Sequence, residues 1–331
     1  MANQGLRPAV RALRNLRNWA FQWESRCVVL LYHRIVAEHP SKTRLGVSRD
    51  LFEAQMDWLK KKYAILSYPE LTQGLLENDI PKRSVVISFD DGYSDNFHFA
   101  RPILEKFKIP AIFFITTSLI GNEAGFWWDE IEELIQGNPG NKPDISLSVG
   151  AQHFHRKIES AEEQSAAVRD LTALLKSCTK EEMDGARISV REWAGISGNV
   201  SSDKRPMNLE ELQTLFKNPL FTAGAHSETH ISLASQSTEI QKKEILGSKQ
   251  ALENWLNCPI RYFAYPFGLP DEHFNRATEK IVERAGLESA CSTARSFITP
   301  FRPDIYRIPR FSVYDWPVEQ FKTELQQFFQ G

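Results

Sequence analysis

Two adjacent acidic residues follow an apolar, β-branched segment in the first third of the chain. The segment Val85–Phe89 is typical of a buried strand and runs directly into Asp90 and Asp91. Gly92 permits a sharp turn, so both carboxylates can face one cleft. Carboxylates held this close resist joint ionisation unless a cation lies between them. The pair therefore indicates a metal site, and a pair of helix N-cap residues is an equally good interpretation of this motif alone.

A second candidate cluster contains two histidines separated by three residues. His226 and His230 follow the apolar segment Phe221–Ala225, which we expect to be another strand. In a helical turn this spacing places both rings on one face, where neutral imidazoles can share a divalent ion. One carboxylate and two histidines leave coordination positions open, as catalytic metal sites do. The two motifs together predict a metal centre at one edge of a parallel sheet.

The two motifs are Phe-Asp-Asp-Gly at 89–92 and His-Ser-x-x-His at 226–230. Their sequences and their order along the chain resemble the polysaccharide deacetylases with NodB homology, which form carbohydrate esterase family 4. The resemblance covers roughly Val28–Val313, apart from an inserted region. It implies a metal-dependent de-N-acetylase that hydrolyses the acetamide of an N-acetylglucosamine-like sugar in a bacterial polysaccharide or glycan precursor and releases acetate. The expected cofactor is one divalent metal ion, with zinc as the default.

The resemblance also implies separate roles for the four motif residues. Asp90 is expected to be the general base. The residues expected to hold the ion are Asp91, His226 and His230.

The segment Phe263–Gly268, which reads Phe-Ala-Tyr-Pro-Phe-Gly, looks like the poly-N-acetylglucosamine deacetylase branch of this family. The resemblance implies that the backbone N–H of Phe267 points toward the oxyanion, and we expect Tyr265 to lie at the substrate. Many family members have an arginine where this chain has Ala264. Arg310, on another expected strand, is the candidate to support the base instead.

The general acid has no match at its common position in the family. No Leu-x-His sequence follows His230, whereas Tyr32 and His33 close an apolar segment near the start of the chain. In the branch named above, a Tyr-His pair at the first strand resembles the late motif moved to the front by permutation. His33 is therefore the candidate acid, and a buried, hydrogen-bonded histidine is the alternative.

Aromatic side chains near the motifs are candidates for contact with the sugar, because aromatic faces stack on sugar rings. These candidates are Tyr93, Trp127, Trp128 and Tyr265. For the two tryptophans an equally good interpretation is that they anchor the insertion to the barrel.

The elements that must position these residues alternate between strands and helices. Alternation of this kind favours a mostly parallel α/β sheet or barrel. The family resemblance implies a distorted (β/α) barrel of about seven parallel strands. The expected strands are Cys27–His33, Tyr63–Leu66, Val85–Phe89, Ala111–Thr116, Phe221–Ala225, Arg261–Tyr265, Ser289–Ser292 and Ile305–Val313.

Residues 137–206 interrupt the alternation with Gly/Pro-rich and Gly/Ser-rich pieces around a polar helix at about Ser160–Cys178. We expect a mainly helical insertion in one barrel domain, residues 25–331. Residues 1–24 contain four arginines beside an imperfect apolar stripe. They predict a basic helical segment with a weak membrane-surface contact, or else a solvated helix or frayed terminus.

The composition is that of a globular protein, with 42% hydrophobic and 25% charged residues among 331. The formal net charge of −2 gives no electrostatic case for nucleic-acid binding. Four widely spaced cysteines argue against a disulfide framework and fit a reducing compartment. No secretory signal is recognisable, so we expect a cytoplasmic protein that could lie at the inner face of the membrane.

Two other functions are compatible with the motifs. A site of two histidines and one carboxylate also serves non-haem iron oxygenases, although those folds are usually β-helical. A glycan-binding pseudo-enzyme is the second alternative, because the arginine of the third motif is missing. Retention of Asp90, which a pure binding protein does not need, argues against it.

Overall fold

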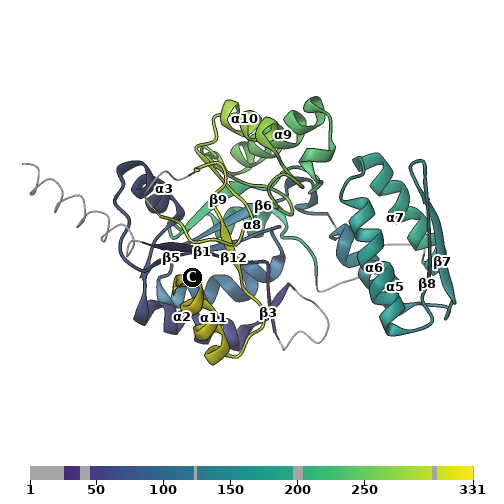
Figure 1. Ribbon diagram of the computed structural model, residues 1–331, viewed down its shortest axis with the longest axis horizontal. Helices are drawn as coiled ribbons and strands as arrows, with labels where there is room; N and C mark the ends of the chain where they lie inside the picture. The colour runs from purple at the N-terminus through teal and green to yellow at the C-terminus, as the bar shows by residue number, and fades with distance from the viewer. Residues whose placement is uncertain (1–25, 38–44, 123–124, 197–203, 300–303, 331) are drawn as a thin grey trace, which may run out of the picture.

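A parallel sheet that curls into a nearly closed barrel forms the centre of the molecule (Figure 1). Seven strands follow one another in the order β11-β10-β9-β6-β5-β1-β12, and the short β4 pairs with β5. These strands are β1 (Cys27–Tyr32), β4 (Ala64–Ile65), β5 (Ser84–Phe89), β6 (Ala111–Ile115), β9 (Phe221–Ala225), β10 (Tyr262–Ala264), β11 (Ser289–Cys291) and β12 (Arg310–Ser312). The computed structural model describes residues 26–37, 45–122, 125–196, 204–299 and 304–330.

The two ends of this sheet meet through the chain that leads into β12. β12 pairs in parallel with β1, and Ile308, just before β12, pairs in parallel with Cys291 of β11. The sheet therefore closes almost completely, which confirms the predicted distorted (β/α) barrel. The predicted strands correspond to observed ones, but the last is shorter than the expected Ile305–Val313.

Strand β5 shows how the sequence builds the barrel. Its six residues are all buried, as expected for a strand covered on both faces. Successive side chains of a strand point to opposite faces. Val85 and Ile87 belong to the core beneath the outer helices, whereas Val86 packs with Ile112 and Phe114 inside the barrel. The same alternation directs the residue after the strand, Asp90, toward the barrel axis.

Helices surround the barrel on its outside (Figure 1). Tyr68 at the start of one of them, α3, reaches Ser289 and Cys291 at β11 and packs with residues of the barrel interior. The outer helices are α2 (Arg49–Lys62), α3 (Tyr68–Glu77), α4 (Arg101–Phe107), α8 (Leu209–Leu215), α9 (Thr238–Leu256), α10 (Arg276–Arg284) and α11 (Val318–Gln330). Shorter elements are β2 (Arg34–Val36), β3 (Gly46–Ser48), a π-helical turn Asn96–Ala100, and 3-10 turns Thr117–Leu119 and Leu233–Ser235.

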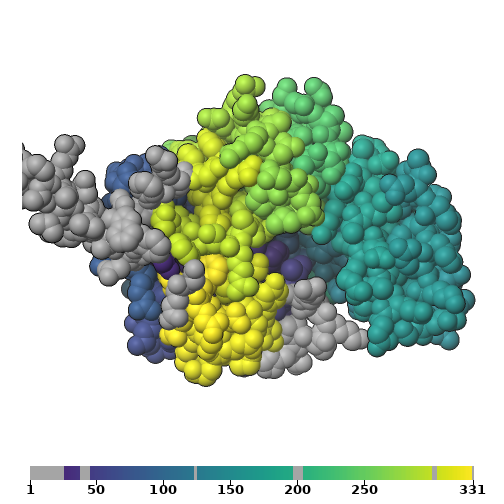
Figure 2. Space-filling model, in the orientation of Figure 1, coloured from purple at the N-terminus to yellow at the C-terminus, as the bar shows by residue number. Residues whose placement is uncertain are grey.

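The part of the chain from α5 to α7, between β6 and β9, forms a lobe at one side of the barrel (Figures 1 and 2). We call this lobe the small domain. It consists of α5 (Trp127–Gly137), β7 (Asp144–Val149), β8 (Gln152–Lys157), α6 (Ala161–Leu175) and α7 (Lys180–Ala194). It has its own apolar core, in which Ile231 of the barrel also takes part.

Local sequence signals account for the small domain's elements. Ser160 and Thr179 each close a capping box at the start of α6 and α7, so both helices begin where their N-terminal N–H groups find acceptors. β7 and β8 form an antiparallel hairpin that the expectation of a mainly helical insertion does not include. The alternation of buried Ile145, Leu147 and Val149 with exposed residues is its signal in the sequence.

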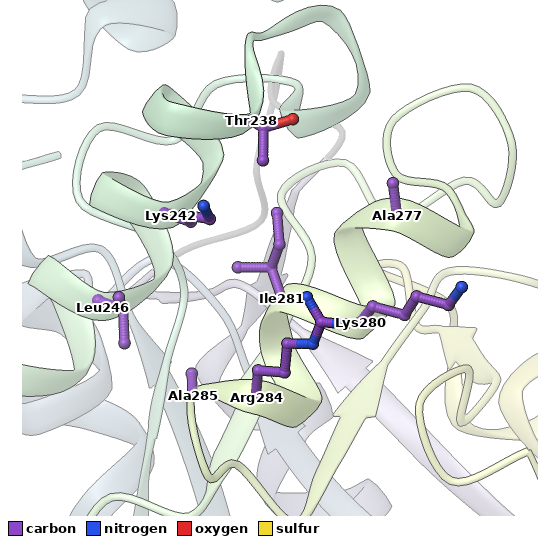
Figure 3. Close-up of a pocket in the computed structure, with 8 residues that line it drawn as sticks. All are labelled: Thr238, Lys242, Leu246, Ala277, Lys280, Ile281, Arg284 and Ala285. Carbon is purple, nitrogen blue, oxygen red and sulfur yellow. The ribbon is translucent and has the colours of Figure 1, made fainter.

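On the outer surface, α9 and α10 enclose a groove of about 290 Å³ (Figure 3). Leu246 and Ile281 contribute apolar surface, and the cations Lys242, Lys280 and Arg284 also line it. None of the motif residues lines this groove. Among the described residues no helix is both long enough and apolar enough to span a bilayer.

Candidate active site

The first residue of the acidic pair, Asp90, is held by an arginine inside the barrel. Arg310 donates from both terminal nitrogens to the two carboxylate oxygens, over 2.7 and 2.8 Å. Its Nε donates to the Ser292 carbonyl over 3.0 Å. Asp90 and Arg310 are 3% and 1% exposed, so this bidentate pair is sheltered from water. The structure thus places Arg310 on the carboxylate that the sequence predicts to be the base.

Asp91 leaves the strand in a left-handed backbone conformation. Its φ is +74°, and that of Gly92 is +93°, which produces the sharp turn expected after β5. The turn brings Asp91 Oδ1 to 3.3 Å from His230 Nε2 and 3.6 Å from His226 Nε2. The two neighbouring carboxylates therefore have different surroundings, one facing an arginine and the other facing two histidines.

His226 is fixed by a hydrogen bond on the far side of its ring. Its Nδ1 lies 2.7 Å from the Ala264 carbonyl oxygen, which can only accept, so Nδ1 carries the proton. Nε2 then has a free lone pair and lies 3.6 Å from both Asp90 Oδ2 and Asp91 Oδ1. Orientation of a histidine by a backbone carbonyl is the usual arrangement for a metal ligand.

His230 reaches the same point through an irregular turn and not through the helical turn predicted from the spacing. Ser227 and His230 have φ angles of +61° and +59°, which no α-helix contains. The Ser227 hydroxyl accepts a hydrogen bond from the His230 N–H over 3.0 Å. The two histidine rings nevertheless meet, with centroids 4.9 Å apart.

Asp91, His226 and His230 together offer one ligand atom each, and all these atoms lie within 4.8 Å of one another. All three residues are buried, and Asp91 Oδ1 accepts no hydrogen bond from the described residues. A buried acceptor without a donor is costly unless a cation meets it. Two imidazoles and one carboxylate suit zinc and similar divalent ions. The residues present therefore fit the metal that the motifs predict.

Electrostatics keeps these groups in the protonation states that a metal needs. Burial lowers the pKa of His226 to about 4, so its ring is neutral near neutral pH. Burial raises the pKa of Asp90, but the charge of Arg310 opposes it and the net shift is downward. Burial likewise opposes ionisation of Asp91, yet the His230 ring, whose Nε2 lies 3.3 Å from Oδ1, brings the pKa of that carboxyl down to about 2.

His33, the candidate acid, lies directly after β1 and is half-buried. His33 lies close enough to Asp90 and Asp91 to contribute to the lowering of the pKa of both carboxyls, so its ring lies on the same side of the barrel as they do. Its backbone carbonyl accepts a hydrogen bond from Asn96 Nδ2 over 2.8 Å. Asn96 therefore holds the backbone at the junction between β1 and β2.

Phe267 lies in a tight turn beside the metal ligands. Phe267 and Gly268 have φ angles of +59° and +66°. The Phe267 N–H makes no hydrogen bond to the described residues, whereas its carbonyl accepts one from Thr293 Oγ1 over 2.8 Å. Its ring lies 4.6 Å from that of His230. The N–H proposed for the oxyanion is thus free to donate.

The aromatic residues predicted to contact the sugar lie in different surroundings. Trp127 is 1% exposed within the core of the small domain, which favours the interpretation that it anchors the insertion. Tyr265 is also buried and stacks on Phe274, with centroids 3.7 Å apart. The Trp128 ring lies next to that of His230, and its Nε1 donates a hydrogen bond to the Tyr93 hydroxyl.

The sequence reasoning missed several residues around the site. Asp129 accepts a hydrogen bond from the Tyr93 hydroxyl over 2.7 Å, and burial raises its pKa to about 6. Lys176, at the end of α6, places its ammonium 4.5 Å from the Phe267 ring centre. Asp129 stands next to the predicted Trp127–Trp128 pair, but nothing in the sequence marks Lys176. Residues 1–24, with the predicted membrane contact, lie outside the described residues.

A family model described as "Polysaccharide deacetylase" matches residues 77–202 and 194–290 of this chain. A curated relative from Staphylococcus aureus (strain MSSA476), named poly-beta-1,6-N-acetyl-D-glucosamine N-deacetylase, is 44% identical over 271 residues. The match covers 82% of this chain and 68% of that relative. Protein YxkH of Bacillus subtilis (strain 168) is 34% identical over 110 residues, which are 33% of this chain and only 38% of YxkH.

A solved structure shares the fold. The deacetylase PplD of Streptococcus pyogenes, in complex with acetate, aligns with a TM-score of 0.60 over 92% of this chain and 99% of that one. The sequence identity is 19%, so this likeness supports the barrel and its small domain and not a particular substrate.

Proposed function

This chain belongs to the polysaccharide deacetylase family, and we propose on that basis that it is a hydrolase that removes acetyl groups from N-acetylglucosamine residues of a glycan. The observation that carries the proposal is that two groups of side chains lie together in one buried cluster. Asp90 is bound to Arg310, and a set of three metal ligands lies directly beside it. Metal-assisted hydrolysis of an amide needs both a general base and a Lewis acid, and these two groups of side chains would provide them.

Each residue has a place in this proposed reaction. Asp90, kept ionised by Arg310, accepts a proton from the attacking water. The Phe267 N–H donates to the oxyanion that forms on the acetyl carbon. His33 donates a proton to the sugar nitrogen as the C–N bond breaks, so acetate and a free amino sugar leave. A divalent ion, which we propose to be zinc, would polarise the amide carbonyl and acidify water when it is bound by Asp91, His226 and His230.

We propose a β-1,6-linked poly-N-acetylglucosamine as the substrate, because the curated relative from S. aureus is named for that polymer. The two alternative functions have less support. The barrel is not the fold expected for a non-haem iron oxygenase. A glycan-binding pseudo-enzyme has no need for a buried Asp90–Arg310 pair, whose desolvation costs stability.

Acetate release from defined oligosaccharides tests the proposal. The metal-stripped protein is assayed with β-1,6-linked and β-1,4-linked N-acetylglucosamine oligomers, with and without added zinc. We expect zinc-dependent release that is faster from the β-1,6 series. Asp90→Asn is expected to bind zinc but to release no acetate, whereas Asp91→Asn is expected to lose both. Zinc-independent release, or full activity of Asp90→Asn, contradicts the proposal.

A further inference from the structure

The two histidines of the metal site are oriented by different means. His226 is fixed by its hydrogen bond to the Ala264 carbonyl. His230 has no such bond, because its buried Nδ1 has no partner among the described residues. A metal-binding histidine normally donates its second ring N–H to an acceptor that sets the ring orientation. Something else must therefore hold the His230 ring in place.

Two aromatic rings flank His230. The centroids of Trp128 and Phe267 each lie 4.6 Å from that of His230. His230 is 6% exposed, so these rings account for much of its surroundings. Phe267 approaches edge-on, at 76°, and Trp128 is tilted by 47°. The ring is therefore confined by packing on two sides instead of by a hydrogen bond.

Trp128 is itself held by a chain of hydrogen bonds. Its Nε1 donates to the Tyr93 hydroxyl oxygen over 2.7 Å, and that hydroxyl donates to Asp129 Oδ2 over 2.7 Å. Lys204 lies 3.9 Å from the other Asp129 oxygen. Tyr93 is fully buried and its hydroxyl already donates one bond and accepts another. This hydroxyl is thus better placed to fix Trp128 than to bind a sugar.

The small domain also contacts the chain that follows His230. Ile231 packs into the apolar core of the small domain. The Ser232 N–H donates to the Lys176 carbonyl over 2.8 Å, at the end of α6. The left-handed backbone of His230 needs such support, because this conformation is unfavourable for a residue with a side chain.

We propose that Trp128, anchored by Tyr93 and Asp129, is a positioning residue that orients His230 for metal binding. The small domain then forms part of the metal site and is more than a lobe attached to the barrel. The inference rests on the metal site of the proposed function. It also assigns Trp128 and Tyr93 a role other than the sugar contact predicted from their aromatic character.

Zinc affinity of the metal-stripped full-length chain tests this inference without any sugar. Zinc alone is titrated by calorimetry, and the visible absorption of the cobalt(II)-loaded protein reports the ligand geometry. We expect Trp128→Ala to raise the zinc Kd about 10-fold or more and to alter the cobalt spectrum. Trp128→Phe restores an aromatic face and should recover part of the affinity. Tyr93→Phe, which releases the Trp128 N–H, should weaken zinc binding several-fold.

Trp193→Phe is the matched control. Trp193 lies on α7 of the same small domain, and its Nε1 donates to the Asp144 carbonyl over 2.9 Å. The control loses the same kind of hydrogen bond at a ring that does not contact the His230 ring, so it should keep the parent's zinc Kd and cobalt spectrum.

The inference is overturned if the Trp128 and Tyr93 variants bind zinc like the parent, or if Trp193→Phe weakens binding equally. Should Trp128→Ala fail to fold, Trp128→Phe and Tyr93→Phe decide the question. A parent that binds zinc but releases no acetate contradicts the proposed function and leaves this test intact.

Discussion

At the scale of single residues, the buried carboxylate of Asp90 depends on one cation. Burial favours its protonated form, and the charge of Arg310 reverses that preference so that the pKa falls. Arg310 cannot lose its proton and has two nitrogens aimed at the carboxylate. Arg310 thus keeps the Asp90 carboxylate ionised despite its burial.

Replacement of Arg310 should move the acid limb of the pH–rate profile. In Arg310→Gln the charge that lowers the Asp90 pKa is gone and burial remains, so that pKa rises. We expect kcat to fall on the order of 10²-fold at neutral pH and to recover partly in alkaline buffer.

Arg310→Lys, which retains a charge, should give a smaller shift of the same profile. Arg261→Gln, at an exposed pair with Glu288, is the control and should leave the profile in place. If the acid limb of the Arg310→Gln profile has the same midpoint pH as that of the parent, Arg310 does not control the ionisation of Asp90.

His33 should matter most for substrates with a poor leaving group. An amine must be protonated as it leaves, whereas a phenolate leaves without help. We expect His33→Gln to lower acetamide hydrolysis about 10²-fold or more and aryl acetate hydrolysis far less. His98→Gln is the control, because His98 lies on the surface beside Glu211. Equal losses on the amide and the ester would exclude His33 as the general acid.

The sequence could predict which residue types meet in the site but not every contact. Asp91, His226 and His230 each follow a strand, and parallel strands end at one edge. Arg310 was the predicted support for Asp90, although no local pattern joins the two, because they lie 220 positions apart and meet only through closure of the barrel. Adjacent tryptophans point in different directions from a helix, so the sequence could not tell which of Trp127 and Trp128 faces His230.

At the scale of the elements, the loops after the strands carry unfavourable backbone. Positive φ angles occur at four non-glycine residues of the site: Asp91, Ser227, His230 and Phe267. Such conformations cost on the order of 1–3 kcal/mol each and persist where surrounding structure enforces them. The spacing of the histidines suggests a helical turn, but an irregular turn is found, because periodicity carries no information about single left-handed residues.

The turn at Gly268 tests this use of backbone strain. A Cβ there would lie 2.9 Å from the Thr293 backbone nitrogen, in addition to a φ of +66°. Gly286 has a φ of +73° and open space around it. We expect Gly286→Ala to lower the free energy of unfolding by about 1 kcal/mol and to remain active. Gly268→Ala should lose more stability and also lower kcat, because it displaces the neighbouring Phe267 N–H.

Urea unfolding and steady-state kinetics on the two glycine variants give this comparison. Equal stability and unchanged kcat in both variants would mean that the 266–268 turn has no part in the reaction.

Element existence was easier to predict than element boundaries. Strands β1, β5, β6 and β9 are mostly apolar and match their predicted positions closely. The β7–β8 hairpin was missed because its alternating residues lie beside a Gly/Pro-rich stretch, which indicates a loop. Ser48 is the N-cap residue of α2, but its hydroxyl donates to Asp315 and caps no helix N–H, and local sequence gives no signal for this long-range contact.

At the scale of the whole molecule, the candidate metal site lies where the barrel meets the small domain. Asp91 and His226 belong to the barrel, while the surroundings of His230 include Trp128 of the small domain. A ligand that binds the folded chain alone stabilises it by mass action. Zinc binding should therefore stabilise the folded barrel and the folded small domain together.

Zinc should raise the melting temperature of the metal-stripped protein. At about 100 times its Kd, zinc contributes about 2.7 kcal/mol, enough to move the transition by several degrees. Differential scanning calorimetry of the parent and of His226→Ala measures the effect. We expect the shift in the parent and none in the variant. The same shift in both would place the zinc elsewhere on the chain.

The most direct measurement is an anomalous difference map at the zinc absorption edge from crystals grown with equimolar zinc. The account predicts one strong peak within coordination distance of Asp91, His226 and His230, with Asp90 still bound to Arg310 beside it. A peak at any other group of side chains, with these three left uncoordinated, would contradict it.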